Sequence, residues 1–236
     1  MSDEQHKMPA EDSLFDEWIA TRPGADFIRD GVVDEKAFLD APLRLVFVLK
    51  DTHGGDFDLR EFLFDGAWTR KDGFKTGSRT WQPIRRVIGK IKQRLGLSMT
   101  NNKRHSFRDI AAINVKKIAG DAVCPWDKLQ DAVERDNEFI AKQFHLYRGT
   151  NAIFICGSTF GFVRKALKGH IETTDINHNG CSFVSLLDNC AIFESGHHPN
   201  RAPIATWDTH IVNTVSAIVD WFHERGYGLQ SSISNQ

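Results

Sequence analysis

Four short apolar runs restrict the fold of this chain more than any other feature of the sequence. They span residues 43–49, 109–115, 152–158 and 190–196, and each is nearly continuous in hydrophobicity. Continuous runs of this length are typical of strands that are buried on both faces. A sheet buried on both faces needs helices on each side, so the runs predict a layered α/β domain.

Helical patterns separate the apolar runs. Apolar side chains recur at helical spacing over residues 84–95, 129–147 and 211–222. Strands that alternate with helices favour parallel pairing, because each helix returns the chain to the same edge of the sheet. We therefore predict an α/β fold, a three-layer α/β/α sandwich whose central sheet has four strands and is mainly parallel.

The N-terminal region and the cysteines bear on where the protein works. Residues 1–12 are polar and lack the apolar core of a signal peptide, so we expect a disordered tail there and a single domain over residues 13–236. No apolar run reaches the length of a membrane-spanning helix, and none of the four cysteines forms a CxxC pair. We expect a cytoplasmic monomer with reduced thiols, no membrane contact and no cofactor.

Charge is distributed unevenly along the chain. The net charge is −1, but residues 70–117 carry 14 Lys and Arg against 2 Asp, whereas residues 1–69 carry 7 against 16 acidic residues. A dense basic segment in a near-neutral protein is typical of proteins that bind a polyanion. The segment predicts contacts with phosphates, and the alternative is a solvated basic face.

Polar residues stand at the end of each apolar run. Asp51 follows the first run, Asn114 lies at the end of the second, Ser158 ends the third and His198 follows the fourth. Ligands of parallel sheets bind beyond the carboxyl ends of the strands, so we expect these side chains around one crevice. Each also has a simpler explanation. Asp51 could cap a helix, Asn114 and His198 could hydrogen-bond loop backbone, and Ser158 could belong to a tight turn.

Common motifs and metal sites are not indicated. The patterns GxGxxG, GxxxxGKS/T, GxSxG and HExxH do not occur. His197 and His198 are adjacent, with Asp208 and His210 nearby in the sequence. Successive side chains of an extended segment point to opposite faces, so the two histidines do not converge on one ion, and we expect no metal.

The order of these polar positions resembles that of the uracil-DNA glycosylase superfamily. Where the family has GQDPYH, LLLN and HPSP, this chain has LKDTHG at 49–54, AAIN at 111–114 and HPNR at 198–201. Residues 74–91, FKTGSRTWQPIRRVIGKI, stand where the family has its DNA-backbone loop and the helix after it. IFICGSTF at 153–160 is similar to the family's LLWGSHA, so the resemblance covers residues 43 to about 222.

The resemblance implies a metal-independent, monofunctional DNA glycosylase that flips a pyrimidine nucleotide out of DNA and hydrolyses its N-glycosidic bond. Asp51 would stabilise the cationic sugar and position the attacking water, and His198 would hydrogen-bond the pyrimidine O2 as negative charge builds there. Asn114 would read the Watson–Crick edge, because one amide both donates and accepts. A ring from residues 57–68, Phe64 by preference, would stack on the flipped base, and the alternative for Phe64 is a place in the core.

Departures from the family pattern concern the substrate. His53 stands where the family has a Tyr against pyrimidine C5, and Gly54 and Gly55 follow it. We therefore expect uracil or a C5-modified pyrimidine as substrate, which suits base-excision repair or defence against modified phage DNA. Arg201 replaces the second proline of HPSP, and Arg201 or Ile204 would fill the gap left by the flipped base. The residues expected to contact DNA are Lys75, Ser78, Arg79, Lys116, Ser158, Asn200, Arg201 and Ile204.

Two other functions fit part of the sequence. A DNA-binding module of the same fold without catalysis would not need both Asp51 and His198. An enzyme acting on free nucleotides or nucleosides would not need the basic segment at 70–117.

Overall fold

The computed structural model describes residues 4–50, 57–64, 78–99, 105–119, 124–147, 151–187, 189–196 and 204–229. For Ser78, Arg79, Leu187 and Ile204 the description covers the backbone alone.

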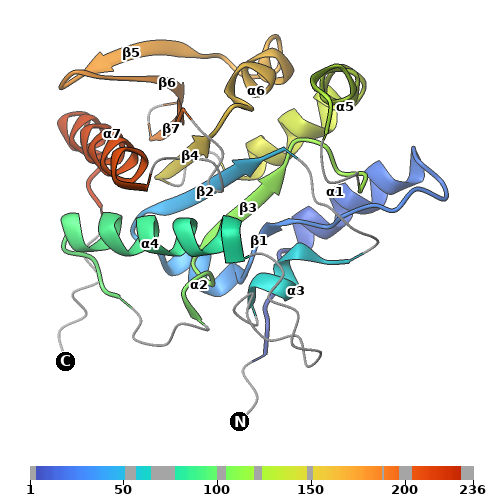
Figure 1. Ribbon diagram of the computed structural model, residues 1–236, viewed down its shortest axis with the longest axis horizontal. Helices are drawn as coiled ribbons and strands as arrows, with labels where there is room; N and C mark the ends of the chain where they lie inside the picture. The colour runs from blue at the N-terminus through green and yellow to red at the C-terminus, as the bar shows by residue number, and fades with distance from the viewer. Residues whose placement is uncertain are drawn as a thin grey trace.

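The strands in the described part of the chain form one mixed sheet of seven strands, in the order β1-β3-β2-β4-β7-β6-β5 (Figure 1). Four neighbouring strands run parallel and correspond to the four apolar runs. They are β2 (Arg44–Leu49), β3 (Ile110–Asn114), β4 (Ala152–Cys156) and β7 (Cys190–Glu194). The prediction of an α/β fold is confirmed.

Three antiparallel strands extend the sheet at its two sides. They are β1 (Gly31–Val32) beside β3, and the hairpin of β5 (Thr174–His178) and β6 (Cys181–Leu187) beside β7. The prediction of a four-stranded, mainly parallel sheet is therefore wrong. β5 has the mostly exposed sequence TDINH, so no apolar run marks it. The turn Asn179–Gly180, with φ of 50° and 74°, carries the Asn-Gly signal that could have revealed this hairpin.

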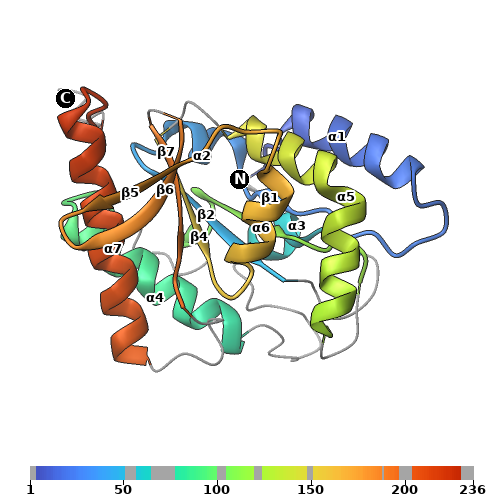
Figure 2. The same cartoon turned by 90° about the horizontal axis from the view of Figure 1, so that it is seen from above.

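Helices pack on both faces of the sheet. Leu45 and Phe47 of β2 contribute to the core on one face, and Val46 and Val48 to the core on the other, because successive strand side chains alternate. The first face carries α3 (Leu59–Phe64), α4 (Ser78–Arg94) and α7 (Ile204–Glu224). The second carries α1 (Pro9–Ala20), α2 (Glu35–Asp40), α5 (Trp126–Leu146) and α6 (Phe160–Leu167). In Figure 2, α7 lies to the left of the strands and α5 to the right.

The helices confirm three predicted elements and correct the N-terminal boundary. The patterns at 84–95, 129–147 and 211–222 fall within or closely match α4, α5 and α7. Residues 9–12, expected in a disordered tail, form the first turn of α1 instead. Pro9 suits the first helical position, and the buried Glu11 carboxylate accepts a hydrogen bond from the Val32 backbone N at 3.1 Å, which fixes the helix to β1. No helix in the described ranges has the length and apolarity needed to cross a membrane.

The four parallel strands end level with one another. Leu49 pairs with Asn114, Val48 with Cys156, and Cys156 with Glu194. The chain therefore leaves all four strands along one rim of the sheet. We call this rim the carboxyl edge and define it as residues 49–50, 114–117, 156–159 and 194–196.

Candidate functional site

The predicted site residues fall into three groups. Asn114, Phe64, Lys116 and Ser158 have described side chains, whereas Ser78, Arg79 and Ile204 are described by their backbone alone. The others lie outside the described residues: Asp51, His53, Lys75, His198, Asn200 and Arg201. The structure thus brings Asn114, Lys116 and Ser158 to the carboxyl edge, and the roles assigned to all these residues stay predictions.

Asn114 is the last residue of β3, and a buried acid holds it. Its side chain is only 2% exposed. Its backbone N and its Nδ2 both donate hydrogen bonds to Oδ2 of Asp30, at 2.7 and 3.2 Å. A carboxylate accepts but does not donate, so Asp30 turns the nitrogen end of the Asn114 amide toward itself.

Asp30 also binds two donors through its other oxygen. Lys117 Nζ donates to Oδ1 at 2.6 Å and Gln143 Nε2 at 3.1 Å, and all three side chains are buried. Burial lowers the pKa of Lys117, and the charge and hydrogen bond of Asp30 oppose that shift. A buried ion pair with further hydrogen bonds is costly to break. The cluster of Asp30, Lys117 and Gln143 therefore holds Asn114 and Lys117 of the carboxyl edge firmly in place.

The buried cluster continues to α1. Gln143 Nε2 lies 3.5 Å from the Tyr147 hydroxyl, and that hydroxyl donates to Glu11. Burial raises the pKa of Glu11 to about 8, although the Tyr147 hydrogen bond and the charge of Arg60 lower it. A Cβ at Gly31 would lie 2.0 Å from Oε1 of Glu11, so only glycine fits beside this carboxyl. Sequence reasoning missed these residues because each is a single polar residue whose partner lies far along the chain.

The side chains of Phe64 and Lys116 differ in their exposure to solvent. Phe64 is buried in the core on the α4 face, and the Arg108 guanidinium lies 4.0 Å from its ring centroid. Lys116 is partly exposed at the carboxyl edge, where its backbone N donates to the Lys50 carbonyl at 2.9 Å. Lys116 therefore reaches the surface at the carboxyl edge, whereas Phe64 exposes little of its ring.

Several cations of the basic segment pair with acids inside the protein. Arg86 Nε and Lys90 Nζ each lie 2.7 Å from Oδ2 of Asp208. Lys92 pairs with Asp109, as Lys117 does with Asp30. These pairs reduce the positive charge that residues 70–117 offer to a ligand.

A metal site finds no support in the described ranges. They contain no group of three His, Cys, Asp or Glu side chains that could hold an ion. Two residues considered as metal ligands have other partners. Asp208 accepts hydrogen bonds from Arg86 and Lys90, and His210 Nε2 lies 3.0 Å from the Glu194 carbonyl oxygen.

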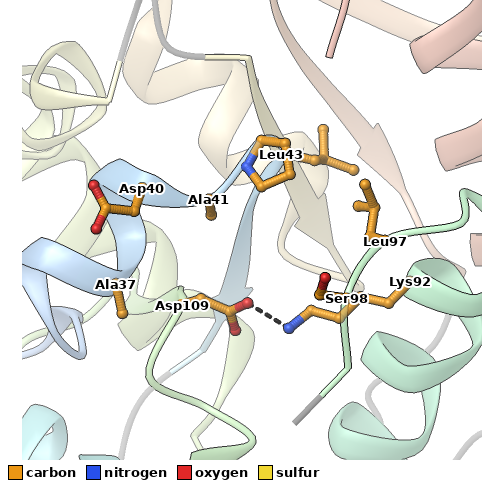
Figure 3. A pocket seen from close by; sticks show the side chains of 9 residues that line it. Ala37, Asp40, Ala41, Leu43, Lys92, Leu97, Ser98 and Asp109 are labelled. Carbon is orange, nitrogen blue, oxygen red and sulfur yellow. Dashed lines mark hydrogen bonds and ion pairs between the residues drawn. The ribbon is translucent and has the colours of Figure 1, made fainter. Parts of the chain in front are cut away.

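A pocket of about 210 Å³ lies at the opposite rim (Figure 3). Leu43 and Asp109, which line it, immediately precede β2 and β3, and the Asp109–Lys92 ion pair closes one side. Ligands of parallel sheets bind at the carboxyl ends of strands, so this pocket is a poor candidate for the main site.

Comparisons of the chain with protein-family models, curated proteins and solved structures gave no match. Its function must therefore be argued from the residues that surround the carboxyl edge.

Proposed function

We propose that this protein is a DNA glycosylase that hydrolyses the N-glycosidic bond of a flipped-out pyrimidine, either uracil or a C5-modified pyrimidine. One observation carries the proposal. The four parallel strands end level at a single rim that includes Asn114 and Ser158, and in the sequence Asp51 and His198 follow the described ends of two of these strands, β2 and β7. Asp51, Asn114 and His198 stand in LKDTHG, AAIN and HPNR, the motifs that resemble those of the uracil-DNA glycosylases.

The chemistry assigns a separate task to each group. The bond between C1′ of the sugar and the base nitrogen breaks, and its electron pair leaves with the base as an anion. Asp51 stabilises the cationic sugar and accepts a proton from the water that attacks C1′. His198 donates a hydrogen bond to the pyrimidine O2, where the negative charge gathers. None of these steps needs a metal or a cofactor.

Asn114 has the geometry of a readout group. Asp30 fixes its amide through the bond from Nδ2 at 3.2 Å, and a fixed amide distinguishes donors from acceptors on a base edge. Asn114 is buried at the carboxyl end of β3, the end of a parallel strand beyond which ligands bind.

Incubation with modified oligonucleotides tests the proposal. Single- and double-stranded DNA would carry one uracil, thymine, 5-hydroxymethyluracil or 5-hydroxymethylcytosine, and alkali would reveal abasic sites. We expect strand cleavage for at least one of these bases with the wild type and none with Asp51→Asn. Binding of DNA without release of any base would instead support a binding module, and the glycosylase proposal would be wrong.

A second candidate is an enzyme that acts on free nucleosides or nucleotides. The internal ion pairs favour it, because Arg86, Lys90, Lys92 and Lys117 are engaged by acids rather than offered to DNA phosphates. Chromatography of nucleosides and nucleotides after incubation decides between the two. Release of free base from these small substrates, with none from DNA, would establish the second candidate.

A further inference from the structure

Trp126 is an exposed aromatic side chain beside Lys50 of the carboxyl edge. It is the first residue of α5, the helix that follows β3, and 49% of it is exposed. In the described ranges only Leu39 and Met99 are large hydrophobic side chains of similar exposure, at 45% and 55%. About half of the Trp126 side chain therefore stays open to solvent, where a ligand could reach it.

The Trp126 ring is held in place by a second aromatic ring. It stacks on Phe162 of α6 with centroids 5.5 Å apart and an angle of 1° between the planes. Phe162 in turn packs against the buried core on this face of the sheet. Because the ring is already ordered, a flat ligand that stacked on it would not bear the entropic cost of fixing the side chain.

Cations lie beside the aromatic rings of this surface. Lys50, the residue after β2, places its Nζ 3.3 Å from the Trp126 ring centroid. On α6 the Arg164 guanidinium lies 5.9 Å from the Phe160 ring, but it is paired with Asp175 at 3.2 Å. Lys50 is therefore the cation that bears on Trp126. Cations interleaved with aromatic rings are the surface that proteins use to bind single-stranded nucleic acid, because rings stack on bases while cations contact phosphates.

We propose that Trp126 stacks on an unpaired base of single-stranded or locally opened DNA, and that Lys50 contacts a phosphate beside that base. Bases in an intact duplex stack on one another, so the ring selects DNA that offers an unpaired base. The choice of DNA as partner rests on the proposed function, whereas the preference for an unpaired base rests on the Trp126 ring and Lys50.

A stacked base and the Lys50 ammonium would compete for the Trp126 ring, and the strengths of the two contacts can be compared. An exposed cation–π contact contributes about 2- to 5-fold in an equilibrium constant. Stacking of a base on an aromatic side chain contributes about 5- to 150-fold. Stacking of a base on Trp126 is therefore stronger than the cation–π contact that the ring makes with Lys50.

A protein partner fits this surface less well. Asp127 and Lys128 follow Trp126 directly and are exposed, so charged side chains adjoin the ring. An apolar helix or strand would need a wider apolar patch than one ring provides.

Fluorescence anisotropy with a labelled oligothymidine of about 15 nucleotides, longer than one typical binding site, tests the inference on the full chain. We expect Trp126→Ala to weaken binding of the single strand by about 5- to 150-fold. Trp126→Phe should retain most of the affinity, because the ring is kept. A blunt duplex should bind both variants nearly as well as the wild type. Leu39→Ala, which removes a similarly exposed apolar side chain from α2, is the matched control and should change nothing.

Each outcome bears on this inference or on the proposed function. Equal single-strand affinities of Trp126→Ala and the wild type overturn the inference, even if the wild type releases a base from DNA. Loss of single-strand affinity in Trp126→Ala supports the inference, even if no preparation releases a base. A protein that binds neither oligothymidine nor the duplex overturns both.

Discussion

Asp30 joins the predicted readout residue to the buried cluster beneath it. Its two oxygens accept hydrogen bonds from Asn114, Lys117 and Gln143. Of these residues the sequence predicted only Asn114, because it ends an apolar run. Asp30, Gln143, Tyr147 and Glu11 give no local signal, since none stands in a motif and the pairs Asp30–Gln143 and Glu11–Tyr147 are separated by much of the chain.

Removal of the Asp30 charge should destabilise the fold. In Asp30→Asn the buried Lys117 loses its counter-ion, so we expect the free energy of unfolding in urea to fall by about 3–5 kcal/mol. Gln143→Leu, the control at the same carboxylate, should cost about 1–2 kcal/mol. Adding Lys117→Met to Asp30→Asn should restore part of the loss. Equal effects of the two single variants would show that the buried charge is not what matters.

Glu11 should make stability depend on pH. Its pKa of about 8 in the folded protein lies above the ordinary value of 4.5, so the folded state holds a proton that the unfolded chain releases. The stability from this proton is complete below pH 4.5 and is lost as pH rises through 8. Arg60, Asp30 and Tyr147 face the carboxyl, and all three act on its pKa or are hydrogen-bonded to it.

Urea unfolding of the wild type and Glu11→Gln measures this dependence. The wild type should lose on the order of 2 kcal/mol between about pH 6 and about pH 8.5, and the glutamine variant should lose clearly less. Parallel pH profiles of the two proteins would contradict the raised pKa.

At the scale of elements, hydrophobic pattern predicted the four parallel strands and missed the three antiparallel ones. β2, β3, β4 and β7 were found because each is buried on both faces. β5 was missed because its side chains face solvent, and β1 because two residues carry no pattern. The level ends of the parallel strands follow from pairing register, which the sequence does not encode in any local segment.

One buried acid joins α4 and α7 in addition to their apolar packing. Asp208 of α7 is buried and accepts hydrogen bonds from Arg86 and Lys90 of α4. Burial alone would raise the pKa of Asp208, but these hydrogen bonds outweigh it and hold the pKa below its ordinary value. The stabilisation is therefore present at neutral pH and is lost as pH falls through the lowered pKa.

Asp208→Asn should lower the free energy of unfolding by about 1–2 kcal/mol at neutral pH, because solvent screens the partly exposed cations. Asp220→Asn, an exposed acid on the same helix, should change it by less than about 0.5 kcal/mol. Urea unfolding at neutral and acidic pH measures both, and the two variants should converge at acidic pH. A loss that is the same for both acids would contradict the role of Asp208 between α4 and α7.

At the scale of the whole molecule, the charge asymmetry seen in the sequence is partly compensated by folding. Asp30 and Asp208 come from acidic parts of the chain and neutralise cations of the basic segment. The sequence predicted a polyanion surface from charge density, but density does not reveal which cations find internal partners. Lys116, partly exposed at the carboxyl edge, is the described cation of the segment best placed for a phosphate.

DNA affinity should fall steeply with salt, because each neutralised phosphate contributes about −0.9 to the slope of log affinity against log salt on duplex DNA. Lys116→Glu should weaken binding for every sequence alike and make the slope shallower by about 1. Lys168→Glu, an exposed cation after the last turn of α6, is the control and should bind as the wild type does. Anisotropy titrations over a range of salt measure the slopes, and a salt-independent affinity would favour the enzyme of free nucleosides.

The central claim is that Asp51 and His198 carry out N-glycosidic hydrolysis. Single-turnover rates of base release, measured with DNA affinity on the same preparations, test it most directly. The account predicts that Asp51→Asn and His198→Ala each lower the rate by about 10²–10³, because each removes a group that acts on charge developing in the transition state. DNA affinity should stay within a few-fold of the wild type. Rates near the wild-type value in both variants would contradict the account.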